Sequence, residues 1–418
     1  RSVDPSEWKS DCRLFTGFSP CRYRRSCAGC PHFDPVEERI LVIQLDALGD
    51  VLRTTAILPA IRTTWRNAHV TWITRREAAP LLAHNPLVDR VLSLAEDTTA
   101  VLAALEFDVV LCPEKSIPAG ALMRAARAPD KRGFTIDDAG NIAPVTEAAY
   151  ELFGLGLDNE AKFFTNTKSA QRLAAEALSL PHKNERYVVV MDDEERRLAR
   201  EDRRIAGVGD DEVLVGWNTG CGPRYPYKRL EVEDQVRLMS TAWARMDRRE
   251  RVRFALLGGG AEDQSRNARI AAELATRRIP VTETPCARGL RRGIAAVAAC
   301  DMVVSGDTLA LHLAIAMRKP VVAWFTITCH QEIDVYGRGI KVLADVPCRP
   351  CWLQSCSLPR KCFRSMPWPE LADSVVEMAD TLLRDGSWSG ERLVGTFPRK
   401  DRVRPPLGVS PGPVIQLS

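Results

Sequence analysis

The chain has 418 residues, 45% of them hydrophobic and 27% charged, and this length predicts two or three domains. Its 58 basic and 54 acidic residues leave a formal net charge of +4, which argues against charge-driven binding to nucleic acid or to a membrane surface. No apolar run approaches the roughly 20 residues of a membrane span, so we expect no transmembrane segment. The 13 cysteines are many for a chain without an apolar N-terminal signal, and most of them crowd into two short segments.

The first half of the chain begins with a polar arm, residues 1–37, and then alternates apolar runs with helical stretches. The run ILVIQL at Ile40–Leu45 predicts a strand buried on both faces, and the following residues suit a helix that begins near Asp50. Further strands are predicted at 70–74, 89–94, 108–113 and 187–191. Such alternation is typical of βαβ units in a parallel sheet.

A second alternation follows the charged segment 192–212, which we interpret as a surface helix and linker whose acidic clusters form a solvated face without a metal. Strands are predicted there at 213–218, 254–260, 302–307 and 320–325. The sequence therefore predicts an α/β protein with two doubly wound Rossmann-like domains that face each other across a ligand-binding cleft. The expected parts are a cysteine-rich arm at 1–37, an N-terminal domain at 38–190, a linker at 191–211, a C-terminal domain at 212–345, a cysteine-rich segment at 346–366, a closing helix at 367–396 and a disordered tail at 397–418.

Four motifs in these domains place polar residues where a strand ends and a helix begins. In LDALGDVLRTT, Asp50 is either a helix cap or a carboxylate that acts as a general base. The loop NTGCGPRYPYKRL carries Thr219 and Lys228 and is a candidate phosphate loop, because backbone amides and a cation can meet an anionic group there. It lacks the spacing of a Walker A loop.

The other two motifs lie further along the second domain. LLGGGAEDQSRNARIA follows a strand, and Glu262 in it is either a first-turn helix acid or a ligand contact. In CDMVVSGDTLALHLAIAMRKPVVAWF a strand ends before Asp307 and Thr308, and His312 follows about one turn into the next helix. Because three such side chains meet at one strand–helix junction, we favour ligand binding over a purely structural role.

Together and in this order, the four motifs resemble those of the ADP-heptose:lipopolysaccharide heptosyltransferases, glycosyltransferase family 9 with the GT-B fold, over roughly residues 38–345. The resemblance implies an inverting glycosyltransferase that moves a sugar, heptose in this family, from an ADP-sugar to a hydroxyl of a glycan or lipopolysaccharide-type acceptor. It implies that Asp50 is the catalytic base. The implied substrate-binding residues are Thr219 and Lys228 at the diphosphate, Glu262 near the adenosine, and Asp307, Thr308 and His312 at the phosphates and the donor sugar.

By the same resemblance, the transfer step needs no metal or other cofactor, and the enzyme works in the cytoplasm or at the inner face of the cytoplasmic membrane. Leu309 departs from the family pattern, which usually has Gly after the Asp-Ser/Thr pair, and Asp46 stands where a small residue such as Ser is common. The donor sugar therefore stays open. The alternatives are a heptosyltransferase with a protein acceptor, as in the autotransporter heptosyltransferases, a nucleotide-sugar epimerase, and a metal-binding protein without catalysis on a transferase scaffold.

The two cysteine-rich segments lie outside the four motifs, and four thiols in so short a stretch are typical of a metal site. The predicted ligands are Cys12, Cys21, Cys27 and Cys30 in the arm and Cys348, Cys351, Cys356 and Cys362 in the later segment. Zinc, iron, an iron–sulfur cluster, one site shared by both segments, thiols without metal and disulfides all stay open. The later segment loosely resembles the autotransporter heptosyltransferases, which carry a cysteine-bound iron in an added element and assemble into rings, so oligomerisation stays open too. We expect these cysteines to hold structure and to take no part in the transfer step.

Overall fold

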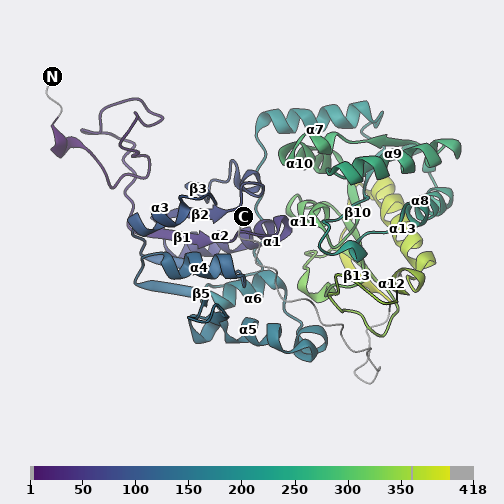
Figure 1. Cartoon of the computed structure of the whole chain (residues 1–418). Coiled ribbons are helices and arrows are strands. Elements are labelled where there is room, and N and C mark those ends of the chain that lie inside the picture. Colours follow the sequence, from purple (N-terminus) through teal and green to yellow (C-terminus); the bar gives the residue numbers. More distant parts are fainter. Residues whose placement is uncertain (1–3, 359–360, 396–418) are drawn as a thin grey trace. The chain divides into compact units, whose positions relative to one another are not determined.

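The computed structural model describes residues 4–358 and 361–395, and the contacts within it divide the chain into two units. Unit 1 comprises residues 1–158 and 170–188, and unit 2 comprises residues 159–169 and 189–418. Each unit contains one sheet of mostly parallel strands (Figure 1), which confirms the predicted α/β class with two doubly wound sheets. The tail expected at 397–418 lies outside the described residues, and the domain boundaries expected from the sequence stay a prediction.

The sheet of unit 1 has the order β3-β2-β1-β4-β5-β6, in which only β6 runs antiparallel to its neighbour. Its strands are β1 (Arg39–Ile43), β2 (His69–Thr74), β3 (Arg90–Ser93), β4 (Val109–Cys112), β5 (Asp130–Ile136) and β6 (Ile142–Pro144). Its helices are α1 (Leu48–Thr54), α2 (Leu58–Thr64), α3 (Thr98–Ala104), α4 (Ile117–Ala125), α5 (Tyr150–Leu157) and α6 (Ala170–Ala177). The central strand β1 is buried from Ile40 to Ile43, as its continuous apolar run predicts.

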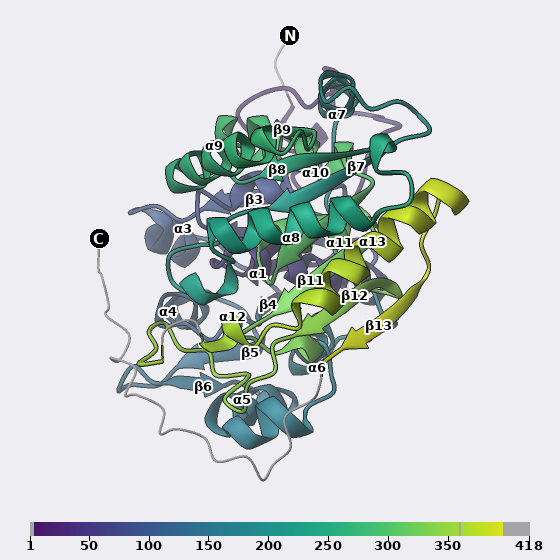
Figure 2. The ribbon, with the colours of Figure 1, turned by 90° about the vertical axis from the view of Figure 1, so that its right-hand side faces the viewer.

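The sheet of unit 2 is parallel throughout and has the order β13-β12-β11-β10-β7-β8-β9. Its strands are β7 (Val213–Asn218), β8 (Val252–Leu257), β9 (Val281–Glu283), β10 (Met302–Gly306), β11 (Val321–Phe325), β12 (Arg338–Leu343) and β13 (Gly390–Val394). Its helices are α7 (Asp193–Ile205), α8 (Val232–Arg245), α9 (Ala261–Thr276), α10 (Leu290–Ala299), α11 (Leu309–Ala316), α12 (Lys361–Arg364) and α13 (Trp368–Asp385). Figure 2 shows α8 and α13 side by side over this sheet, and their apolar residues form one core with Trp217 and Trp324 of β7 and β11.

Two predictions about secondary structure are wrong. The apolar run 187–191 forms no strand, because its backbone bonds to side chains: Val188 N donates to Thr55 Oγ1 at 2.7 Å, and Arg291 Nη2 donates to Val190 O at 2.7 Å. The segment expected to be only a closing helix also contains β13, which pairs with β12 at the sheet edge. Four of the five β13 residues are exposed, so this strand lacks the apolar run that marks a buried one.

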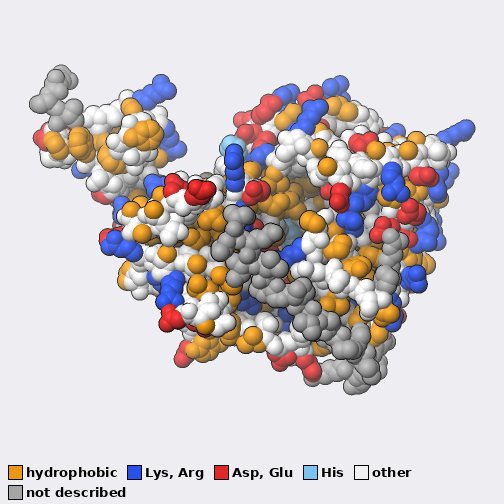
Figure 3. Space-filling view, in the orientation of Figure 1, with side chains coloured by type: hydrophobic (Ala, Val, Ile, Leu, Met, Phe, Trp, Pro, Cys, Tyr) orange, Lys and Arg blue, Asp and Glu red, His pale blue; other side chains and the backbone are white. Residues whose placement is uncertain are grey.

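Charged side chains of both signs are mixed over the face seen in Figure 3, in keeping with the near balance of acids and bases. No helix in residues 4–358 or 361–395 is long and apolar enough to span a membrane.

Candidate functional site

The polar motif residues of unit 2 gather at the carboxyl ends of β7 and β10, which are neighbours in the sheet. Asn218 ends β7, and Asp307 directly follows β10. The loop after β7 returns to this edge and brings Lys228 to Asp307, although the two are 79 residues apart in sequence. The topology thus assembles a charged cluster where open α/β sheets bind their ligands.

Asp307 lies at the centre of this cluster and is 6% exposed. Lys228 Nζ lies 3.1 Å from Asp307 Oδ2, and His312 Nε2 lies 3.5 Å from Asp307 Oδ1. Burial alone raises the pKa of Asp307, but the neighbouring Lys228 and His312 hold that pKa well below its usual range. Asp307 is therefore a buried anion that orients a cation and an imidazole at the edge of the sheet.

Gly306 explains how the Lys228 loop comes so close to β10. A Cβ at this position would lie 2.2 Å from the carbonyl oxygen of Lys228, so only glycine permits the approach. The same carbonyl accepts a hydrogen bond from Trp324 Nε1 at 2.9 Å, and the Tyr227 carbonyl accepts one from Thr326 Oγ1 at 2.5 Å. The loop is thus fixed to β11 and the residues after it through main-chain atoms.

Thr308 lies beside this cluster at the start of α11. Its hydroxyl accepts a hydrogen bond from Asn218 Nδ2 at 3.0 Å and lies 3.1 Å from Ser305 Oγ. Leu309, the residue that departs from the family pattern, is the first residue of the helix and is half-buried. Asn218 was missed by the sequence analysis, although its place at the end of a predicted strand could have marked it.

Thr219 is fully buried, unlike a side chain that meets a ligand directly. Its hydroxyl donates to the carbonyl of Leu257 at 3.1 Å and bonds to Asn267 Oδ1 at 2.5 Å. Gln235 Nε2 donates to the carbonyl of Thr219 at 3.1 Å. The side chain of Thr219 therefore holds the base of the loop, and its predicted contact with a diphosphate stays a prediction.

Glu262 lies in the first turn of α9, and 84% of its side chain is exposed. Arg229 Nη1 is 3.9 Å from its carboxylate. The next residue, Asp263, accepts the Gly260 amide at 3.4 Å, and a Cβ on Gly220 would lie 2.0 Å from the Asp263 carboxylate. Asp263 thus packs against a glycine of the loop after β7, whereas Glu262 keeps its carboxylate open to solvent.

The cysteine-rich segment after β12 contributes an aromatic side chain to this cluster. The Trp352 ring lies 5.3 Å from Lys228 Nζ and 4.8 Å from Lys162 Nζ, and it meets the Tyr225 ring edge-on at 5.5 Å. The two distances from lysine to the ring are in the range of cation–π contacts. Trp352 Nε1 also donates to Cys329 Sγ at 3.4 Å, and this contact fixes the plane of the ring.

The thiols of this segment differ in their surroundings. Burial raises the pKa of Cys362 to about 12, and the nearby Cys351 and Cys348 add to that rise. Cys356 Sγ accepts a hydrogen bond from the Leu358 amide at 3.4 Å, so this thiol stabilises a local turn. No three cysteine sulfurs in the described residues lie within 4.8 Å of one another, so the metal ligands expected in this segment stay a prediction.

Asp50 belongs to unit 1, at the third position of α1 just beyond the carboxyl end of β1. Its carboxylate accepts the Ala47 amide at 3.4 Å and pairs with Arg53 Nη2 at 2.5 Å, and 45% of the side chain is exposed. Asp50 is therefore both a helix cap and an accessible carboxylate. The two interpretations of this residue are compatible, and its role as a base stays a prediction.

Glu114 is a second carboxylate near this turn that the sequence analysis missed. It follows β4, the neighbour of β1, and its Oε2 accepts the Leu45 amide at 2.5 Å and the Asp46 amide at 3.2 Å. Burial raises the pKa of Glu114, while hydrogen bonds from Ser116 and from the backbone work against that rise. Glu114 thus holds the turn that presents Asp50.

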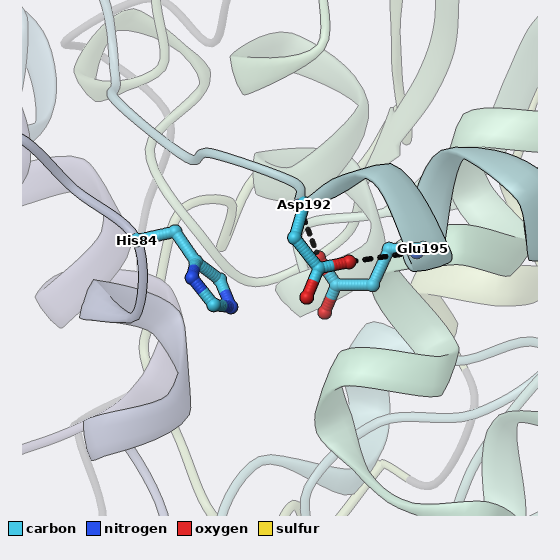
Figure 4. A group of neighbouring side chains, drawn as sticks. All are labelled: His84, Asp192 and Glu195. Atoms are coloured by element: carbon cyan, nitrogen blue, oxygen red, sulfur yellow. Dashed lines mark hydrogen bonds between the residues drawn. The ribbon is translucent and has the colours of Figure 1, made fainter.

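The acidic start of α7 is stabilised within its own helix (Figure 4). Asp192 accepts the Glu195 amide at 2.8 Å, and Glu195 accepts the Asp192 amide at 2.9 Å, which is a capping box. Glu195 also pairs with Arg291 of α10. His84, drawn in the same figure, belongs to unit 1. These contacts give the two acids a structural role in fixing α7 to unit 2.

The fold matches three solved glycosyltransferases. A glycosyltransferase family 9 protein from Veillonella parvula is 17% identical, with 84% of this chain and 99% of that chain covered at a TM-score of 0.62. The E. coli heptosyltransferase WaaC with ADP is 18% identical, covering 81% and 99% at 0.51, and E. coli ADP-heptose lipopolysaccharide heptosyltransferase II is 18% identical, covering 74% and 91% at 0.54. Identities this low show the fold alone, and that fold is the GT-B fold of the glycosyltransferases.

Part of the sequence of unit 2 also matches the model of one glycosyltransferase family. The model of glycosyltransferase family 9 (heptosyltransferase) matches residues 242–361, a span that contains Glu262, Asp307, Thr308 and His312. Residues 242–361 thus match glycosyltransferase family 9, in agreement with the resemblance seen in the sequence. A search of curated proteins found no match.

Proposed function

We propose that the protein is an inverting glycosyltransferase that moves a sugar, heptose in the first instance, from an ADP-sugar to a hydroxyl of a glycan or lipopolysaccharide-type acceptor. The observation that carries the proposal is the Asp307–Lys228–His312 cluster at the carboxyl edge of the unit 2 sheet. An ammonium and an imidazole ordered in advance by a buried carboxylate suit a departing diphosphate, because they need no rearrangement as its charge develops. ADP in the similar E. coli heptosyltransferase WaaC supports the choice of nucleotide.

On the donor side, Lys228 and the first amides of α11 would face the diphosphate. The Lys228 ammonium has three donor hydrogens, and Asp307 takes one of them at 3.1 Å. The amino end of α11 adds partial positive charge. Trp352 packs over the same ammonium, and a ring in that position limits the directions in which the ammonium can turn.

On the acceptor side, Asp50 would take the proton of the attacking hydroxyl. Its exposed carboxylate sits at the amino end of α1, where Arg53 and the Ala47 amide orient it. The bond between the anomeric carbon and the diphosphate breaks as the acceptor oxygen attacks from the opposite face, and ADP leaves with both bonding electrons. The proton passes to Asp50.

The test is a transfer assay with ADP-heptose and a deacylated lipopolysaccharide core, with UDP-glucose and GDP-mannose as competing donors. We expect Asp50→Asn to reduce kcat by about 100-fold or more, which is in the range of general base catalysis, while ADP binding measured by calorimetry stays unchanged. Asp46→Asn, a change at a neighbouring acid of the same turn, is the control. A chain that binds no ADP and turns over none of these donors would contradict the proposal.

A further inference from the structure

The N-terminal arm of unit 1 contains a closed loop, residues 11–36. Cys12 and Pro35 form an isolated antiparallel bridge at its base. The Arg13 guanidinium fastens this base to the sheet by donating to both carboxylate oxygens of Asp89 at 3.0 Å. The arm is therefore a folded element with a fixed base.

The loop folds through turns that begin at its cysteines. At each of the four, the carbonyl oxygen accepts the amide hydrogen of the residue three positions later, which is the hydrogen bond of a β-turn. The pairs are Cys12 with Phe15, Cys21 with Arg24, Cys27 with Cys30, and Cys30 with Phe33, at 2.9, 2.8, 3.2 and 3.3 Å. The chain thus reverses at every cysteine, so the four side chains return to one region.

This loop has no hydrophobic core of its own. No side chain from residue 4 to residue 39 is buried, and Phe18 is 88% exposed, in keeping with the hydrophobic surface of the arm in Figure 3. The four arm cysteines form no disulfide. Folded elements of fewer than about 40 residues usually need disulfides or metals, because burial cannot offset the entropy of ordering the chain. Something besides burial must cross-link this loop.

All four thiols line a single hollow of about 390 Å³ inside the loop. Trp8, Phe15 and Tyr23 also line it, so its walls are sulfur and aromatic carbon. A water molecule in the liquid takes up about 30 Å³, so the hollow is much larger than a single ion needs. Lys9 and Arg25 lie at the same hollow and offset the negative charge that four thiolates would bring.

The arm thiols are not gathered as closely as a single zinc ion would hold them. Four thiolates bound to one zinc at about 2.3 Å lie about 3.8 Å from one another. No three cysteine sulfurs in the described residues lie within 4.8 Å of one another. In a four-iron cluster each thiolate binds a different iron atom, so the sulfurs stand further apart. Two-iron clusters are also bound by four cysteines with a single C-x2-C pair, so the number of irons stays open.

We propose that Cys12, Cys21, Cys27 and Cys30 bind an iron–sulfur cluster that cross-links the arm. The juxtaposition that carries the proposal is four turn-forming thiols around one hollow in a loop without a core. The cluster serves as the internal support of the loop, with the aromatic side chains as its shield from solvent. The proposal is independent of the transfer reaction, because the arm lies outside the four motifs that carry the proposed function.

The experiment measures metal and acid-labile sulfide in the full-length chain, expressed with added iron and purified without oxygen. We expect about two or about four irons per chain from this site, with as many sulfides as irons, and a broad visible absorbance that bleaches on reduction. Cys21→Ser and Cys30→Ser should each lose these irons and this sulfide. Cys286→Ser, which removes a thiol of unit 2 hydrogen-bonded to Thr284 at 3.0 Å, is the matched control and should keep them.

A second readout separates loss of the cluster from general misfolding. Arg22, Arg24 and Arg25 lie within the loop, so trypsin should cut the two arm variants there at least tenfold faster than the parent chain, while the rest of the chain resists as before. Zinc as the only bound metal, iron without acid-labile sulfide, paired disulfides in the arm without metal, or iron that survives both arm substitutions would each overturn the proposal.

Discussion

The pair of Lys228 and Asp307 allows a quantitative test of the site. Asp307 is 7% exposed and Lys228 18% exposed at their side chains, with 3.1 Å between them. In Lys228→Met the carboxylate loses this ammonium and keeps His312, at 3.5 Å. Breaking a buried ion pair from one side costs about 3–5 kcal/mol, because an uncompensated charge stays buried. We therefore expect unit 2 to lose about 3 kcal/mol of unfolding free energy in this variant.

The double variant Lys228→Met, Asp307→Asn should recover most of this loss, because it leaves no buried charge. Urea unfolding followed by tryptophan fluorescence measures the difference: about 3 kcal/mol lowers the midpoint by about 1–1.5 M at a slope of about 2–3 kcal/mol/M. The matched control is Lys341→Met. Lys341 is less exposed than Lys228, at 8%, but its partner Glu391, 2.9 Å away, is 40% exposed and can be solvated by water. The control should lose about 1 kcal/mol or less.

The sign of the pH dependence gives a further check. The folded pKa of Asp307 lies below its unfolded value of 3.8, so its contribution to stability is present above that pH and is lost as the pH falls toward the folded pKa. Without Lys228 the folded pKa rises, so the stability gap between the parent and Lys228→Met should shrink as the pH falls from 7 to below about 4. A single variant that loses under about 1 kcal/mol, or a double variant no more stable than the single one, would refute the reasoning.

Three further substitutions test other contacts. Trp352→Ala should raise KM for the donor about 3- to 30-fold by removing the cation–π contact with Lys228, and Trp352→Phe should restore most of the affinity; equal values for both variants would exclude this positioning role. Gly306→Ala should lower the melting temperature of unit 2 by several degrees, since its Cβ would lie 2.2 Å from the Lys228 carbonyl, and an unchanged Tm would contradict that packing. Arg13→Leu should expose the arm to trypsin, because it removes the bonds to Asp89, and an unchanged cleavage rate would show that the loop base is held by other contacts.

The strands β1 to β4, β7, β8, β10 and β11 were predictable mainly because buried parallel strands are continuous apolar runs, as in Ile40–Ile43 and β7. The strands β5, β6, β9 and β12 were not predicted. The apolar run at 187–191 gave a wrong prediction, because such a run indicates that side chains are buried. It does not tell whether the backbone pairs with another strand. The same signal also failed at β13, where the residues are exposed and only pairing with β12 makes them a strand.

In the candidate site, the sequence predicted part of the Asp307 cluster but not the contacts that come from distant segments. Asp307 and His312 stand five positions apart, so one helix turn brings them together, whereas Lys228 reaches them only through the order of the strands. Nothing near Trp352 in the sequence points to a phosphate loop more than 100 residues earlier. Thr219 stands at the motif position expected to contact a diphosphate. Its side chain is nevertheless buried, and its hydroxyl bonds to Asn267.

The loop after β7 is attached through main-chain atoms, whereas its contact surface is formed by side chains. The loop is held by the carbonyl oxygens of Tyr227 and Lys228, which every amino acid possesses, while the contact surface is made by side chains. A mutation at Lys228 can therefore change what the loop recognises without moving the loop. Substitutions at Trp324 or Gly306, by contrast, would displace the main chain of the loop at Lys228. The chemical groups that the loop presents can thus change while Trp324 and Gly306 keep its main chain in place.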